Sequence, residues 1–384
     1  MTDPRNQTAD GNPASTLLDR ADITPLLQPF DSIPGLELSN RFVMAPMTRK
    51  FSPRNVPGES VVDYYAKRAS SLGLIVTEGT YVDEHSAGSS NRVPVFYGDE
   101  PLAGWRQVVD AVHAQGGRIF PQLWHLGATR IAGAGPNNDA PIVSPSGLGL
   151  EGQPVGEPAT AATIEGIVDS FVRAAADAKA VGFDGIELHG AHGYLLDQFT
   201  WEKTNRRTDS YGGSIANRMR ISAEIVTAIR ERVGAEFPIS YRFSQWKGGH
   251  YDARIADTPH ELEQHLLPLV EAGVSVLHVS TRRYWLPEFE DSARTLAGWT
   301  KHLTGLPVIA LGSVGVSAPF LGHESEAQTS LSLAPLLDLF DRGEFDLVGL
   351  GRAVLAEPHW VKKVAAGDLD SIQTYHKDLE SVLV

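Results

Sequence analysis

The sequence of 384 residues contains no cysteine. This absence excludes disulfide bonds, cysteine-ligated zinc, iron–sulfur clusters and a thiol nucleophile. No apolar run approaches the roughly 20 residues that a membrane-spanning helix needs. Basic residues are also scarce relative to acidic ones, because 33 Lys and Arg stand against 47 Asp and Glu, which gives a net charge of −14. Nucleic acid and anionic membranes would repel such a chain, so we expect neither as a partner.

The first residues lack the features of a secretory signal. Residues 1–14 are polar and include Pro4 and Pro13, without the basic flank and the apolar core of a signal peptide. We therefore expect a cytoplasmic protein with a disordered N-terminal tail over residues 1–20. The remaining residues, 21–384, are numerous enough to bury one large core, and we predict a single domain there.

Eight short runs of apolar, β-forming residues recur at long intervals. They are Phe42–Ala45, Leu74–Thr77, Arg118–Leu123, Gly185–Leu188, Ile239–Phe243, Val276–Val279, Pro307–Ala310 and Asp346–Leu350. Stretches of helical period lie between several of them, such as the one that contains Ile164, Val168 and Phe171. Strands that alternate with helices pair in parallel, and eight such units close a TIM barrel. The pattern predicts an α/β fold, a single (β/α)8 barrel.

A long segment without helical period follows the third predicted strand. Residues 124–160 contain seven Gly and five Pro. Loops of this length are usually functional, so we predict an excursion over one mouth of the barrel. The alternative is a linker between two domains, which is disfavoured because the fourth strand is needed to close the barrel.

Glycines follow the last two predicted strands, at Gly312-Ser313 and within Gly349–Arg352. In a TIM barrel these two loops often bind phosphate. Glycine lets backbone N–H groups approach an anion, and an arginine can bind it through two parallel hydrogen bonds. The third glycine of a dinucleotide fingerprint is replaced by Val354, so the pattern favours a mononucleotide or sugar phosphate over bound NAD. The alternative is an ordinary glycine-rich turn with a surface arginine.

His189, His192 and Tyr194 follow the fourth predicted strand. Two histidines three residues apart on a tight turn can donate hydrogen bonds to one oxygen atom, or they can bind a metal ion. Zinc would need a third ligand and carboxylates behind the histidines, so we predict no metal. Tyr194 is protonated at neutral pH and can act as a general acid. The structural alternatives are a histidine that caps the strand and a tyrosine that packs as a ring.

Arg242 ends the fifth predicted strand. An arginine inside a barrel mouth needs an anionic partner. That partner is either a carboxylate such as Glu187 or a ligand that becomes negative during turnover. The sixth strand ends without a lysine, which argues against Schiff-base chemistry.

These residues resemble the Old Yellow Enzyme family of flavin-dependent ene reductases. The matching segments are residues 40–49, 122–124, 189–199, 205–218, 312–314 and 349–352. They occur in the same order and cover about residues 35 to 365. The run from Asn205 to Ser214 is the most specific, and we expect it to be structural, with Ser214 as the N-cap of the following helix.

The resemblance implies a barrel that binds FMN without a covalent link. The phosphate would lie on Gly312, Ser313, Gly351 and Arg352, and the ring would lie against Pro46, Met47, Thr48, Gly79 and Gln122. Thr48 would hydrogen-bond near the flavin O4 and N5 atoms, where part of the family has a cysteine. Arg242 would lie beside N1 and O2, where a fixed cation favours reduction of the flavin.

The resemblance further implies reduction of the C=C bond of α,β-unsaturated carbonyl or nitro compounds. NADPH or NADH would reduce the flavin and leave, and flavin N5 would then deliver hydride to the β-carbon. His189 and His192 would polarise the substrate oxygen, Trp124 would contact the substrate, and Tyr194 would protonate the α-carbon.

Several questions stay open at the level of the sequence. A flavin oxidoreductase of the same fold could act on a nitro compound or a dienoyl ester, and a barrel could bind a phosphorylated ligand without turnover. Residues 244–247 and 282–285 follow the fifth and sixth strands and either overhang the pocket or pack on the surface. A homo-oligomer is compatible with the sequence.

Overall fold

The computed structural model describes residues 21–316 and 332–384, and the predicted tail over residues 1–20 lies outside them. Eight parallel strands form a closed barrel. They are β3 (Phe42–Met44), β4 (Leu74–Tyr81), β5 (Arg118–Trp124), β6 (Ile186–His192), β7 (Ile239–Lys247), β8 (Val276–Ser280), β9 (Val308–Leu311) and β10 (Leu347–Leu350). The last strand, β10, pairs with both β9 and β3 and so closes the ring. Each predicted run overlaps one of these strands, and the predicted (β/α)8 barrel is confirmed.

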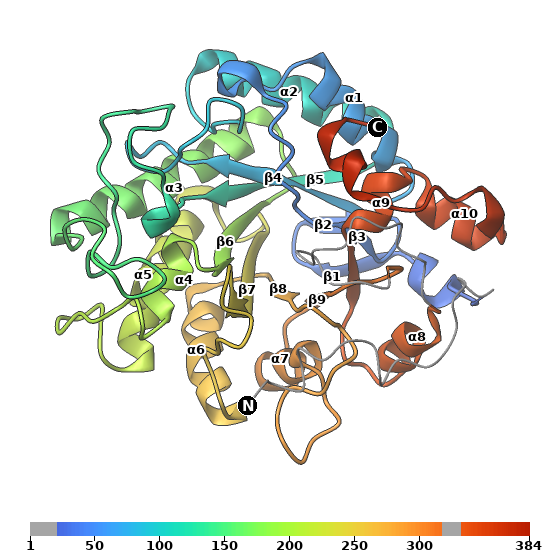
Figure 1. Cartoon of the computed structure of the whole chain (residues 1–384). Coiled ribbons are helices and arrows are strands. Elements are labelled where there is room, and N and C mark those ends of the chain that lie inside the picture. Colours follow the sequence, from blue (N-terminus) through green and yellow to red (C-terminus); the bar gives the residue numbers. More distant parts are fainter. Residues whose placement is uncertain (1–20, 317–331) are drawn as a thin grey trace.

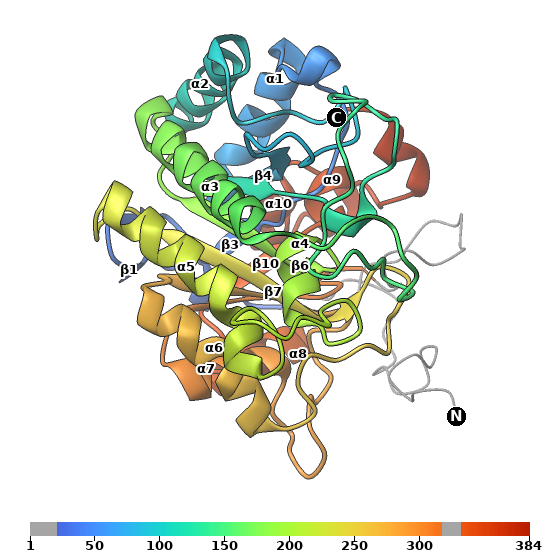
Figure 2. The same ribbon diagram turned by 90° about the vertical axis from the view of Figure 1, so that its left-hand side faces the viewer.

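Helices surround the strands (Figure 1). They are α1 (Glu59–Ala69), α2 (Asp99–Ala114), α3 (Ala161–Val181), α4 (Leu195–Thr200), α5 (Ile215–Val233), α6 (Pro259–Ala272), α7 (Leu296–Thr304), α8 (Ala334–Asp341), α9 (Arg352–Ala356) and α10 (Trp360–Ala366). Figure 2 shows α3, α5 and α6 side by side along one flank of the barrel. Each buries an apolar face, as α3 does with Ile164, Ile167 and Phe171. This packing, rather than helix propensity alone, holds the helices against the barrel.

Local signals in the sequence set the ends of these helices. The hydroxyl of Ser214 accepts a hydrogen bond from the backbone N–H of Asn217 at 3.3 Å, so the predicted N-cap of α5 is confirmed. Helix α3 ends at Gly182, which adopts a left-handed conformation with φ of +107°. Glycine takes this conformation without the steric cost that a side chain imposes.

A hairpin that the sequence analysis did not predict precedes the barrel. Its strands are β1 (Phe30–Ile33) and β2 (Leu36–Leu38), which pair antiparallel. The buried side chains of the hairpin pack against residues at the beginnings of barrel strands, such as Leu74, Val276 and Leu347. The hairpin therefore closes the amino-terminal end of the barrel and leaves the carboxyl-terminal end for a ligand.

The long segment after β5 consists of turns and one short 3-10 helix, η4 (Gly127–Thr129). It lies beside the carboxyl ends of β6 and β7, where Glu151 pairs with His250 at 2.9 Å. The prediction of an irregular excursion at this end is confirmed. All residues from 125 to 160 are described, however, and none of them lines the main cavity. The excursion borders the mouth rather than covering it.

Within residues 21–316 and 332–384, no helix has the length and apolar character required to cross a bilayer.

Candidate functional site

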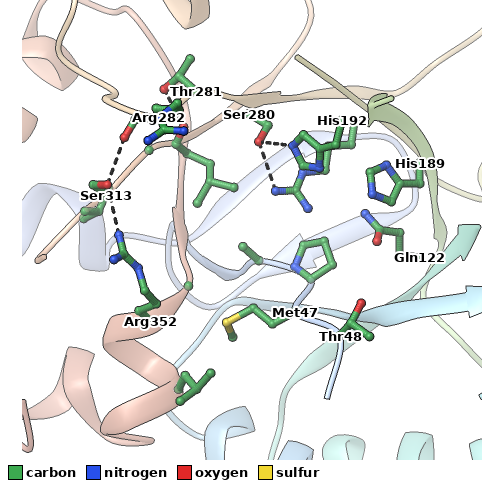
Figure 3. A pocket seen from close by; sticks show the side chains of 18 of the residues that line it. Met47, Thr48, Gln122, His189, His192, Ser280, Thr281, Arg282, Ser313 and Arg352 are labelled. Carbon is green, nitrogen blue, oxygen red and sulfur yellow. Dashed lines mark hydrogen bonds between the residues drawn. The ribbon is translucent and has the colours of Figure 1, made fainter. Parts of the chain in front are cut away.

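A cavity of about 480 Å³ lies at the carboxyl-terminal end of the barrel. Its size falls within the range of small-molecule and cofactor sites. The structure brings thirteen of the predicted site residues to its wall: Pro46, Met47, Thr48, Gln122, Trp124, His189, His192, Tyr194, Arg242, Gly312, Ser313, Gly351 and Arg352. Figure 3 shows His189 and His192 at one side of this cavity, and Ser313 and Arg352 at the other.

Gly79 is the predicted site residue that does not line the cavity. It lies on β4 opposite Gln122. A β-carbon at this position would lie 2.5 Å from the ring of Trp124. The missing side chain of Gly79 makes room for the indole of Trp124, which lines the cavity at this place, and a contact between Gly79 and the cofactor stays a prediction.

Aromatic side chains form one end of the cavity. The rings of Trp124 and His189 are nearly parallel, with their centroids 6.1 Å apart. The ring of Tyr194 meets both edge-on, at 4.8 Å from Trp124 and 4.9 Å from His189. These contacts fix the phenol beside the imidazole, so the predicted proximity of His189 and Tyr194 is present in the structure.

His192 faces His189, with the two ring centroids 5.2 Å apart and the planes almost perpendicular. Its Nε2 atom lies 2.8 Å from the Ser280 hydroxyl, and Trp246 stacks on its ring at 4.3 Å. The sequence analysis left the role of Trp246 open, and the structure places it in the cavity wall.

The protonation states of these groups follow from their surroundings. Burial, together with the nearby positive charge of Arg242, lowers the pKa of both His189 and His192 well below the ordinary value. Both imidazoles are therefore neutral at neutral pH, and each can donate one hydrogen bond. Burial raises the pKa of Tyr194, so its hydroxyl keeps its proton. The cavity holds one phenolic proton beside two neutral donors.

Arg242 lies on β7 in the cavity wall, opposite His189 in the pairing of β6 with β7. Its Nη2 atom donates to the hydroxyl of Ser280 at 3.2 Å, and its buried Nε atom has no hydrogen-bond partner. Burial lowers the pKa of Arg242 to about 10, which still leaves it charged at neutral pH. A buried cation with an unused donor fits a ligand that carries or develops negative charge.

Glu187 was the alternative partner of Arg242. In the described residues no ion pair joins them, because the Glu187 carboxylate accepts hydrogen bonds elsewhere. Its partners are Gln122 Nε2 at 2.9 Å, the Ser240 hydroxyl at 2.9 Å and His278 Nδ1 at 2.7 Å. Since a carboxylate only accepts, the amide nitrogen of Gln122 must point toward it. This leaves the amide oxygen of Gln122 as the acceptor for a ligand.

Arginines gather at the other end of the cavity. The hydroxyl of Ser313 accepts from Arg352 Nη2 at 3.2 Å and from Arg283 Nη1 at 3.0 Å. A β-carbon at Gly312 would lie 2.4 Å from Oγ1 of Thr281, so the backbone here is packed as only glycine allows. Burial lowers the pKa of Arg352 to about 10, which leaves a cation. This end of the cavity is suited to a phosphate.

Arg283 is a residue whose role the sequence did not reveal. It follows β8 in the Arg282–Trp285 segment, whose function the sequence left open. Within residues 21–316 and 332–384, no carboxylate lies within ion-pair distance of Arg283. Two neighbouring arginines after a barrel strand were the available signal, although surface arginines are common enough to hide it.

Within residues 21–316 and 332–384, no group of three or more His, Asp or Glu side chains could hold a metal ion. The residues instead fit a flavin mononucleotide, because the cavity combines a phosphate-sized cationic end, an unused arginine donor on Arg242 and an aromatic end.

Comparison with known proteins also supports a flavin site. The model of the NADH:flavin oxidoreductase / NADH oxidase family matches residues 25–370. The chain belongs to this family. The resemblance to the Old Yellow Enzyme family is thereby confirmed, and the protein is an NAD(P)H-dependent flavin oxidoreductase whose cofactor is FMN.

Two curated members of the family are similar over most of this chain. The 12-oxophytodienoate reductase 7 of Oryza sativa subsp. japonica is 38% identical in an alignment of 359 residues that covers 88% of this chain and 87% of the rice protein. An NADH oxidase of Thermoanaerobacter brockii is 36% identical over 89% of this chain. The chain spans only 51% of that oxidase, about half of its length.

Solved structures of the family share the barrel. A mutant of morphinone reductase in complex with tetrahydroNAD superposes with a TM-score of 0.76 at 29% identity, and covers 93% of each chain. An old yellow enzyme homologue from Zymomonas mobilis has a TM-score of 0.76 at 24% identity, over 93% of this chain and 96% of that one. The latter likeness concerns the fold alone.

Proposed function

We propose that this family member is an ene reductase, which uses NAD(P)H to reduce the C=C bond of α,β-unsaturated carbonyl or nitro compounds. The observation that carries the proposal is the meeting of two neutral histidines and a protonated tyrosine at one end of the cavity. The names of the similar 12-oxophytodienoate and morphinone reductases support a reductase of small organic molecules.

The cofactor would be held at both ends of the cavity. The phosphate would bind to Arg352, Ser313 and the backbone at Gly312 and Gly351, which all line the cavity. Arg283 does not line the cavity, but it donates to the Ser313 hydroxyl and would add its charge to this end. The ring would lie against four further residues: Pro46, Met47, Thr48 and Gln122. Arg242 would face the part of the ring that gains negative charge. When bound, FMN supplies the hydride that the alkene accepts.

The side chains of the protein would prepare the substrate for that hydride. His189 and His192 would donate hydrogen bonds to the carbonyl or nitro oxygen and stabilise the negative charge that develops there. Tyr194 would give its proton to the α-carbon, and the hydroxyl is available because its pKa is raised. Trp124 would pack against the substrate and fix its orientation.

A test separates the two halves of the reaction. The purified protein should show a flavin spectrum that NADPH or NADH bleaches without oxygen, and 2-cyclohexenone should restore the colour. Tyr194→Phe should slow the restoration by about 10²–10⁴-fold while bleaching stays near the parent rate, because only the second half needs the proton. Equal slowing of both halves would remove Tyr194 as the proton donor. A parent protein that bleaches but never recovers with any enone or nitroalkene would refute ene reduction.

A further inference from the structure

A buried ion pair lies behind the His192 turn and outside the cavity. Lys247, the last residue of β7, places its Nζ atom 2.8 Å from Oδ1 of Asp197 on α4. The exposed fractions of the two side chains are 0% and 1%, and neither side chain lines the cavity. Removing two charges from water costs several kcal/mol per ion, so a buried pair is weak evidence for stability and calls for another explanation.

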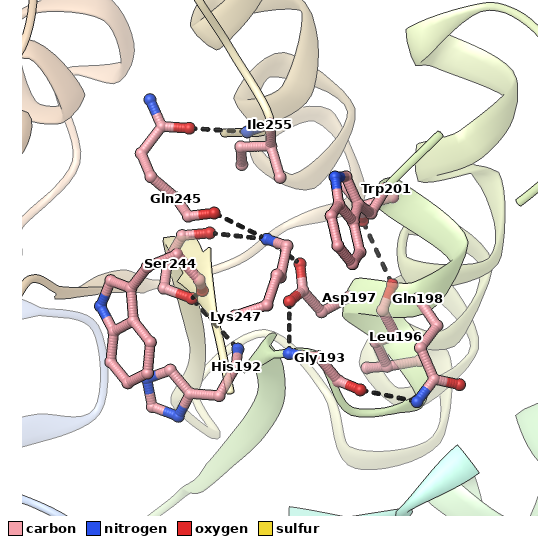
Figure 4. Close-up of polar contacts among 12 residues, drawn as sticks. His192, Gly193, Leu196, Asp197, Gln198, Trp201, Ser244, Gln245, Lys247 and Ile255 are labelled. Carbon is pink, nitrogen blue, oxygen red and sulfur yellow. Dashed lines mark hydrogen bonds and ion pairs between the residues drawn. The ribbon is translucent and has the colours of Figure 1, made fainter. Parts of the chain in front are cut away.

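The pair is connected to the backbone on both sides of the turn (Figure 4). The second oxygen of Asp197 accepts the backbone N–H of Gly193 at 2.6 Å. The amino group of Lys247 also donates to the carbonyl oxygens of Gln245 at 2.9 Å and Ser244 at 3.3 Å. One ion pair thus links the residue after His192 to the end of the neighbouring strand.

The same strand end holds His192 itself. The backbone N–H of His192 donates to the hydroxyl of Ser244 at 3.1 Å. Its carbonyl oxygen accepts the N–H of Gly248 at 3.0 Å. The peptide groups before and after His192 are therefore both fixed by residues around Lys247 and by Asp197.

His192 needs this support because its backbone is strained. Its φ is +65°, in the left-handed region, which is unfavourable for a residue with a β-carbon. Such conformations persist only where the surroundings determine them. In this conformation the imidazole reaches Ser280 and stacks on Trp246, at the cavity wall.

We propose that Asp197 and Lys247 are positioning residues, whose ion pair holds the His192–Gly193 turn in the left-handed conformation that directs His192 into the cavity. This inference rests on the proposed role of His192 as a substrate hydrogen-bond donor. Neither side chain of the pair lines the cavity, so we expect its effect on ligands to act through the His192–Gly193 turn.

The experiment is a double-mutant cycle on ligand affinity. Phenol, whose oxygen would accept hydrogen bonds from the histidines, is titrated into the FMN-loaded holoenzyme, and its binding is followed in the flavin absorbance. We expect Asp197→Asn to weaken phenol binding about tenfold, and to add almost nothing when His192→Ala is already present. Adding Lys247→Met to Asp197→Asn should not recover the affinity, because the link between the turn and the strand end stays broken although no unpaired charge stays buried.

Two further variants protect this test against unfolding. Asp346→Asn breaks another ion pair, with Lys301 at 2.6 Å, and should leave phenol affinity unchanged even if it lowers Tm. Should Asp197→Asn not fold, Ser244→Ala takes its place, because it removes the acceptor of the His192 N–H without stranding a charge.

The outcomes are distinct. An Asp197→Asn holoenzyme that binds phenol like the parent would overturn the inference, as would an equal loss with and without His192. If His192→Ala itself leaves phenol affinity unchanged, the proposed donor role of His192 fails, and with it the basis of this inference.

Discussion

Ser313 is the point at which two arginines from different loops converge. Arg352 follows β10 and Arg283 follows β8, and both donate to the same hydroxyl oxygen. Like charges this close repel one another, and the proximity of Arg283 contributes to the lowered pKa of Arg352 after burial. A dianionic phosphate between them would relieve that repulsion, so we expect Arg283 to contribute to phosphate binding as Arg352 does.

This convergence predicts a difference between two flavins. Arg283→Ala should weaken binding of FMN to the apoprotein about 10- to 100-fold and leave riboflavin, which has no phosphate, unchanged. Fluorescence titration of both flavins measures the effect. Arg352→Ala should have the same effect. Arg294→Ala should change neither affinity, because Arg294 belongs to the same loop but places its guanidinium over the ring of Trp299. If Arg283→Ala weakens both flavins equally, the arginine only shapes its loop.

At the scale of elements, the loop after β3 depends on one carboxyl group of β4. Glu78 is 1% exposed, and one of its oxygens accepts the backbone N–H groups of Arg49 at 2.9 Å and Lys50 at 3.2 Å. This anchors the loop that carries Met47 and Thr48 to the cavity wall. Burial raises the pKa of Glu78 from 4.5 to about 7.

The raised pKa of Glu78 makes the stability of the fold depend on pH. The folded protein binds the proton more tightly than the unfolded chain, so this stabilisation is complete below pH 4.5 and is lost as pH rises through 7. Between pH 5 and 8 the loss should be about 2.5 kcal/mol. Urea unfolding at both pH values should show that Glu78→Gln, which keeps an acceptor but does not titrate, removes this part of the slope. An unchanged slope would mean that Glu78 is ionised throughout.

Elements differ in how far the sequence predicts them. The eight barrel strands follow from apolar runs between amphipathic helices, since burial on both faces demands continuous apolar residues. The hairpin of β1 and β2 escaped this reading because its strands are short and its core face becomes apparent only with the barrel end beneath it. Its signal was the alternation in Leu36–Leu38 after Pro34-Gly35, a typical turn pair.

The residues of the site also differ in how far the sequence predicts them. Residues at strand ends could be predicted, because the barrel brings all carboxyl ends to one face. The Asp197–Lys247 pair could not, since the two residues are fifty positions apart and their contact depends on how α4 packs beside β7. Nor could the sequence show that Gly79 packs against the indole of Trp124, because the position of that indole is set by tertiary packing.

At the scale of the whole molecule, the two ends of the barrel differ, because one is closed by packing and the other holds the cavity. The hairpin packs into the amino-terminal end with Ile33 only 1% exposed, whereas the cavity lies at the carboxyl-terminal end. In TIM barrels the first end serves stability and the second serves chemistry.

This separation predicts that stability and cofactor binding respond independently. Ile33→Ala should lower the free energy of unfolding by about 2–4 kcal/mol through lost burial and a residual cavity. Urea unfolding measures this change. The affinity for FMN, measured on the folded variant, should equal that of the parent, and a weaker affinity would show that the two ends are coupled.

The hairpin also has a consequence for how ligands enter and leave the barrel. Because packed side chains close the amino-terminal end, we expect molecules that react with the flavin to enter and leave through the opening at the carboxyl-terminal end. The electron donor and the compound to be reduced would then bind alternately, and each would inhibit the binding of the other.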